Sequence, residues 1–229
     1  MQAVSRGNKK EMTNYYRILN CSNMEYIDPT DLGCVDTLIG FCTQDSRVTK
    51  VLQVLLYDRW SGCDVVVLGE NARTSLVDME NHLSDGNWLH FIRHYEQSFQ
   101  TDSIFDLLSK EPGFINVSKD VLVYEDAIGE DPVLLVNGNL MEFVDVTRLE
   151  GTSVGLLEKK ISPVILLLTA GNGYGPGDYT GPGEEFVGRW LSTWASSVEQ
   201  IYCMFDEKQG IKENLLKKGY KELVPGFRY

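Results

Sequence analysis

The sharpest polar set in this chain consists of two acids and an Arg-Trp pair that each occur twice in similar surroundings. Its members are Glu25, Asp28, Arg59 and Trp60, and then Glu142, Asp145, Arg189 and Trp190. Two carboxyl groups held close together can act as a general acid and a base or nucleophile. In a structural use, Asp28-Pro29 marks a turn whose carboxylate accepts backbone N–H groups, and Glu25 pairs with Arg59 over the Trp60 ring. We favour the structural use and predict no catalytic residue.

A glycine-rich segment lies just before the second Arg-Trp pair. Gly171 to Gly183 holds six glycines and two prolines in thirteen residues. Such loops can hold a phosphate with their backbone N–H groups. This one has no lysine, lacks the phosphate-loop pattern and runs into two glutamates that repel anions. We predict an exposed loop that binds a partner or a ligand, and we expect the contact residues to be Tyr174, Asp178, Tyr179 and Arg189.

Metal binding is the other chemistry that residue spacing suggests. His90 and His94 lie four residues apart, as zinc ligands on a helix do. Trp88, Ile92 and Tyr95 mark the apolar face of that predicted helix, and the two histidines fall on the side that faces solvent. We therefore predict no metal site and no cofactor.

The cysteines and the net charge indicate a compartment and exclude some partners. Five cysteines is an odd number and no Cys-x-x-Cys occurs, so neither a disulfide framework nor a zinc ribbon fits. We predict reduced thiols in a cytoplasmic or otherwise intracellular, soluble protein. A net charge of −12 argues against nucleic acid, whose phosphates need Lys and Arg clusters, and is compatible with a basic protein partner.

Hydrophobicity along the chain gives no sign of a membrane. No apolar run approaches the roughly 18 residues of a spanning helix, and the first residues lack the apolar core of a secretory signal. We expect residues 1–13 to be a disordered, basic extension, with either Met1 or Met12 as the native start. With 229 residues, 43% of them hydrophobic, the chain can bury one large core or two small ones.

The segments that position the polar set also occur twice. Residues 19–32 read LNCSNMEYIDPTDL and residues 136–149 read VNGNLMEFVDVTRL, with six of fourteen positions identical. Chance predicts about one identity in such a window, so we infer an internal duplication. Aligning the Arg-Trp pairs as well requires one insertion in the second copy, and the glycine-rich segment has the length for it.

Each copy is expected to fold as β-β-α-β, which makes the protein α+β. A hairpin opens each copy, and Asn137-Gly138 supplies the tight turn of the second one. Asp45 or Ser46 caps the first helix, and Ser162-Pro163 begins the second, although a buried strand at 164–168 remains an alternative. The expected boundaries are 14–73 for the first repeat, 74–120 for a helical connecting segment and 121–229 for the second repeat with its insertion.

These motifs resemble those of a family of small uncharacterised proteins. Residues 15–20, YYRILN, followed by EYIDP at 25–29, resemble the family's Tyr-Tyr-x-Ile-x-Asn strand and Lys-Glu-Tyr-Ile-Asp-Pro segment. Arg59-Trp60 and the apolar strand after it resemble a Gly-Arg-Trp-Ala-Gly-Asp element, apart from an inserted Cys63 and Glu70-Asn71 in place of Asp-Tyr. The glycine-rich segment is similar to one that some members carry before Arg-Trp. The resemblance implies relatedness and no particular activity.

We expect this protein to act by binding rather than by catalysis. The predicted function is a non-catalytic protein-binding or assembly subunit that acts through the surface of the lobes or through the glycine-rich loop. The alternative is an enzyme or small-ligand sensor with a site between the two lobes near that loop, where pockets tend to form.

Overall fold

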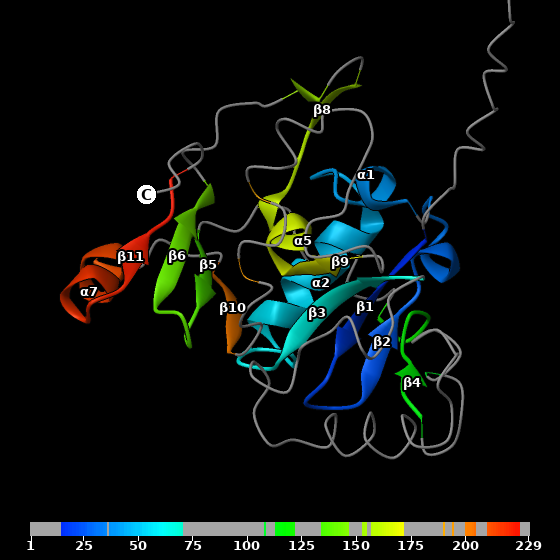
Figure 1. Cartoon of the computed structure of the whole chain (residues 1–229), viewed down its shortest axis with the longest axis horizontal. Coiled ribbons are helices and arrows are strands. Elements are labelled where there is room, and N and C mark those ends of the chain that lie inside the picture. Colours follow the sequence, from blue (N-terminus) through cyan, green and yellow to red (C-terminus); the bar gives the residue numbers. More distant parts are fainter. Residues whose placement is uncertain are drawn as a thin grey trace, which may run out of the picture.

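The computed structural model of the chain describes residues 15–35, 37–70, 108, 113–121, 134–146, 153–154, 157–171, 190, 194, 200–204 and 210–224. In these residues, helices pack with a five-stranded sheet, a four-stranded sheet and a two-stranded ribbon (Figure 1). The fold is therefore α+β, as predicted. The expected extension at 1–13 lies outside the described residues.

The first sheet has the strand order β4-β2-β1-β3-β9. Its strands are β1 (Tyr16–Asn20), β2 (Glu25–Ile27), β3 (Val65–Gly69), β4 (Ile115–Asn116) and β9 (Thr169–Gly171). β1 is antiparallel to both of its neighbours, whereas β4 and β9 join the two edges in parallel. β1 and β3 are almost wholly buried, which is typical of central strands that are covered on both faces.

The second sheet has the strand order β10-β5-β6-β11. Its strands are β5 (Leu134–Asn137), β6 (Glu142–Asp145), β10 (Ile201–Met204) and β11 (Lys221–Glu222). β5 is antiparallel to both of its neighbours, and β11 joins the edge of β6 in parallel. Figure 1 shows this sheet on the left, with helix α7 (Ile211–Lys217) beside β11. β7 (Ser153–Val154) and β8 (Leu157–Lys160) form the separate ribbon.

The two sheets pair their strands in the same register. Asn20 lies opposite Glu25 in the first sheet, and Asn137 lies opposite Glu142 in the second. On the other side of each asparagine, β3 pairs with Asn20 and β10 pairs with Asn137. The parallel edge strands β4 and β11 pair with Glu25 and Glu142, respectively. Register decides which side chains face the core, so both sheets place corresponding residues on corresponding faces.

The hairpin turns of the two sheets are built alike. Asn20 accepts the backbone N–H three residues on at 3.0 Å, and Asn137 does the same at 2.9 Å. Each turn ends in a methionine with positive φ, 55° at Met24 and 54° at Met141. Our prediction that Asn137-Gly138 would supply a tight turn was wrong. Asn137 instead ends β5, and its buried side chain holds a longer turn.

Capping residues define where the longer helices begin. α2 (Arg47–Tyr57) starts after Ser46, whose hydroxyl accepts the N–H of Thr49 at 3.1 Å. α5 (Pro163–Leu168) starts with the predicted proline, so the helix interpretation of 164–168 is confirmed and the strand alternative is wrong. The short helix α1 (Leu38–Phe41) and the 3-10 helix η1 (Pro29–Leu32) come before α2. Among the described helices, none is long and apolar enough to cross a membrane.

One apolar core joins the two sheets. α2 packs against β10, and α5 packs against β3 and leads into β9, which completes the first sheet. Figure 1 shows α2 and α5 together at the centre of the molecule. A backbone bond also joins the two sheets, because Gly62, just before β3, donates to the carbonyl of Ile201 on β10 at 2.9 Å. A second bond, from Ser162 to the carbonyl of Cys42 at 2.9 Å, joins the segments that precede α5 and α2. The two sheets therefore depend on segments from both halves of the chain.

Part of the predicted connecting segment belongs to the first sheet. We predicted a helical segment at 74–120, of which Leu108 and residues 113–120 are described. Leu108 is helical, but Ile115–Asn116 form β4, and the N–H of Ile115 donates to the carbonyl of Met24 at 2.9 Å. The edge of β2 offers backbone groups to any extended segment nearby. Two strand residues are too few to leave an alternating pattern in the sequence.

Candidate functional site

Glu25 accepts two donors from the turn between α2 and β3. Arg59 donates from Nη2 to Oε1 and Trp60 donates from Nε1 to Oε2, each at 2.6 Å. The predicted Arg59–Glu25 ion pair is confirmed. Trp60, which we placed under the guanidinium, binds the same carboxylate through its indole N–H. The Trp60 ring is fully buried, whereas 33% of the Arg59 side chain is exposed. The Glu25 carboxylate therefore connects a core residue to a partly exposed one.

Glu142 accepts an indole N–H in the same way, but from Trp194. The Trp194 Nε1 lies 3.0 Å from Oε2, and the ring is fully buried. We had matched Trp60 with Trp190, which is also buried but does not donate to Glu142 in the described structure. Spacing to the next strand is the signal that our alignment overlooked. Trp60 precedes β3 by five residues, whereas Trp194 precedes β10 by seven and Trp190 by eleven.

Asp28 fixes the end of β2 and the start of η1. Its Oδ1 accepts the N–H of Thr30 at 3.1 Å, which is the turn bond that we predicted. Its Oδ2 accepts Nε of Arg17 at 2.8 Å, and the Arg17 guanidinium lies 5.2 Å from the centre of the Tyr26 ring. The N–H of Asp28 donates to Ser118 Oγ at 2.8 Å. Asp28 therefore connects β1, β2 and the segment that follows β4.

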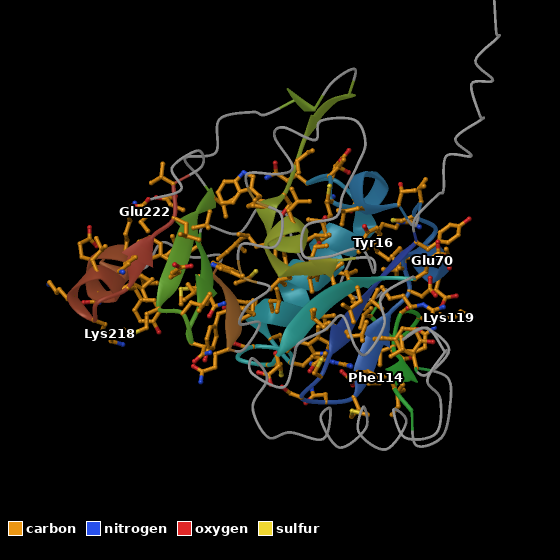
Figure 2. All side chains as sticks on the ribbon, in the orientation of Figure 1. Tyr16, Glu70, Phe114, Lys119, Lys218 and Glu222 are labelled. Atoms are coloured by element: carbon orange, nitrogen blue, oxygen red, sulfur yellow. The ribbon has the colours of Figure 1, made fainter. Side chains whose placement is uncertain are left out.

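Asp145 in the second sheet also pairs with a cation that lies near an aromatic ring, but this cation is a lysine. Lys212 Nζ on α7 lies 2.9 Å from Asp145, 2.8 Å from Glu222 and 5.8 Å from the centre of the Phe143 ring. Burial lowers the pKa of Lys212, but the two carboxylates outweigh it and raise the pKa above its usual value. Figure 2 shows Glu222 on β11, beside α7. Sequence comparison missed this cation because Arg17 comes from β1 whereas Lys212 comes from a helix.

All five cysteines are free, as predicted. Burial raises the pKa of the Cys21 and Cys203 thiols and raises that of Cys42 to about 12. Burial also dominates at Cys63 and raises its pKa, although the side chain of Asn20 favours the thiolate. The thiolate is the nucleophilic and metal-binding form. These four thiols are therefore poorly suited to covalent catalysis at neutral pH.

The remaining predicted site residues, and the two histidines, lie outside the described residues. They are Tyr174, Asp178, Tyr179, Arg189, His90 and His94. The start of the loop is described: β9 pairs with β3 and ends at Gly171, the first residue of the glycine-rich segment. Within the described ranges, no three His, Cys, Asp or Glu side chains come together as metal ligands. No protein-family model, curated protein or solved structure matches this chain.

Proposed function

We propose that this chain is a non-catalytic subunit that binds a protein partner or helps to assemble a larger complex. The observation that carries the proposal is the use of four carboxylates in matching places. Glu25, Asp28, Glu142 and Asp145 each accept donors from neighbouring parts of the fold. A carboxylate committed to such partners is poorly placed to exchange a proton with a substrate. These bonds argue against proton transfer at the four carboxylates and favour binding at the molecular surface as the function.

We further propose that the scaffold arose by internal duplication into two β-β-α-β repeats. Three structural features that recur at matching positions support this. They are the asparagine that accepts a backbone N–H in the turn, the methionine with positive φ and the glutamate that accepts an indole N–H. Backbone bonds recur as well, from Cys21 to Asp64 at 2.8 Å and from Gly138 to Gln200 at 2.9 Å. A shared fold class alone does not require agreement in such detail.

The contact region that we propose is the glycine-rich loop, with Tyr174, Asp178, Tyr179 and Arg189 as its contact residues. Seven residues, 58–64, separate α2 from β3, whereas 32 residues, 169–200, separate α5 from β10. Long connections in compact proteins commonly carry function. Aromatic rings and a guanidinium are also the groups that protein interfaces favour.

Charge favours a basic protein as the partner. The chain carries a net charge of −12, which attracts a positively charged surface and speeds its approach. The same charge repels the phosphates of nucleic acids. Five free thiols suit an intracellular location, where disulfides are rare.

Capture of the partner from the protein's own source tests this proposal. The tagged full chain should co-purify with a second polypeptide at fixed stoichiometry, as judged by native mass spectrometry. The matched variant Tyr174→Ala/Asp178→Ala/Tyr179→Ala should lose that polypeptide while its melting temperature stays within a few degrees of the parent. A small molecule that the parent retains and the variant loses would instead favour the enzyme or ligand sensor with a site between the lobes.

A further inference from the structure

Glu25 and Glu142 occupy matching places but differ in their donors. Glu25 accepts Trp60 on Oε2 and Arg59 on Oε1, both at 2.6 Å. Glu142 accepts Trp194 on Oε2 at 3.0 Å. Within the described part of the chain, no Lys or Arg forms an ion pair with Glu142. The first sheet therefore supplies its own cation, and the described second sheet leaves Oε1 to accept a further donor.

The surroundings of Glu142 fix where that donor would bind. Pairing opposite Asn137 sets the backbone, and the buried Trp194 ring sets the orientation of the carboxylate. Oε1 then corresponds to the oxygen of Glu25 that meets a guanidinium. Glu142 is half-buried, so a ligand can reach it from solvent, and partial burial strengthens a charge-assisted hydrogen bond relative to a fully exposed one.

We propose that Glu142 binds an arginine side chain of the protein partner and so repeats, between two molecules, the contact that Arg59 makes within this chain. This inference rests on the proposed function and specifies what the partner contributes. A guanidinium suits the site better than an ammonium because its planar N–H groups match a carboxylate and are less strongly hydrated. Lys221, exposed on β11 opposite Glu142, repels a second cation, so binding of a single arginine is weak.

The Trp194 indole N–H is a direct reporter of this site in the full-length protein. In two-dimensional ¹⁵N NMR, N-acetyl-arginine amide should shift the Trp194 indole resonance in a saturable way. N-acetyl-citrulline amide has nearly the same shape without the charge and should not. The Trp60 resonance is the internal reference, because its glutamate already holds Arg59. Trp194→Phe and Trp60→Phe variants assign the two resonances.

Two variants make the test specific to the carboxylate. Glu142→Gln should abolish the arginine-dependent shift, because glutamine still accepts the indole N–H but carries no charge. Arg59→Ala should make the Trp60 resonance respond to the same probe, because it leaves Glu25 with an indole donor alone, which is what the described residues give Glu142. Lys221→Ala should strengthen binding at Glu142, because it removes the repelling charge.

Several results would overturn the inference. They are a Trp194 resonance that does not move, one that moves equally with citrulline, and one that still moves in Glu142→Gln. A response that emerges only in Arg189→Ala would show that the chain's own arginine holds the carboxylate, which also contradicts the proposal. If any of these occurs while the partner is still captured through the loop, the proposed function stands and Glu142 alone is removed from the contact surface.

Discussion

Trp194 donates its buried indole N–H to the first residue of β6, just as Trp60 donates to the first residue of β2. Each indole comes from the segment that precedes the third strand of its sheet. A buried N–H without an acceptor costs about 1–3 kcal/mol, so each glutamate stabilises the position of a large core side chain. The hairpin and the helix-to-strand connection of each sheet are thereby held together by one polar contact.

The first prediction concerns energetic coupling between Trp194 and Glu142. In a double-mutant cycle with Trp194→Phe and Glu142→Ala, we expect a coupling free energy of about 0.5–2 kcal/mol, because each variant removes one partner of the hydrogen bond that the two side chains share. Urea denaturation of the parent, both single variants and the double variant measures it. The same cycle with Trp190→Phe is the control and should give no coupling. Coupling at Trp190 instead of Trp194 would restore the alignment of the Arg-Trp pairs.

Arg59→Ala should destabilise the protein by about 1–2 kcal/mol. The change removes a charge-assisted bond to Glu25, but the guanidinium is partly exposed and solvent screens the pair. Arg59→Lys should recover part of the loss, and high salt should reduce the difference between parent and variant. The midpoints of urea denaturation of the parent and both variants, measured at low and high ionic strength, test these expectations. An Arg59→Ala midpoint equal to that of the parent would show that the ion pair contributes nothing to folding.

Stability should fall at alkaline pH because of the buried thiols. Burial raises the pKa of Cys42 from 9.0 to about 12, so the folded protein keeps a proton that the unfolded chain releases. The stabilisation is complete below the unfolded pKa and is lost as pH rises through the folded one. The unfolding free energy should therefore decline between about pH 9 and pH 12, and Cys42→Ala should make the decline shallower. An unchanged slope in Cys42→Ala would exclude this thiol as a cause.

Cutting the chain between the two sheets should give fragments that need one another. Fragments 1–127 and 128–229, produced together, should form a one-to-one complex, because α5 and β9 complete the first sheet and α2 packs on β10. Size-exclusion chromatography with a tag on one fragment tests for the complex, and circular dichroism tests each fragment alone. Two fragments that fold separately and do not associate would show that the shared core is dispensable.

Local patterns in the sequence predicted the elements that local forces determine. The turn at Asp28-Pro29, the cap at Ser46 and the proline that starts α5 all depend on residues within one helical turn. The turn and the proline are found as predicted, and Ser46 is one of the two caps that we expected. The Arg59–Glu25 pair was also predictable, because both residues recur with the same neighbours.

Long-range partners could not be read from the sequence in the same way. β4 and β9 are too short to carry a pattern, and each forms because another strand offers it an edge. Lys212 meets Asp145 from a helix with no counterpart in our alignment. Trp194 was missed because an identical Arg-Trp dipeptide outweighed the spacing to the next strand. Tertiary packing determined all of these contacts.

Mass analysis of the intact protein, purified from its own source under native and then denaturing conditions, tests most directly whether this chain is a binding subunit. The account predicts that the native mass includes a second polypeptide. Under denaturing conditions that polypeptide should separate, and the mass of this chain should be that of its unmodified sequence. A native mass that includes only a small molecule, together with turnover of that molecule by the purified protein, would contradict it.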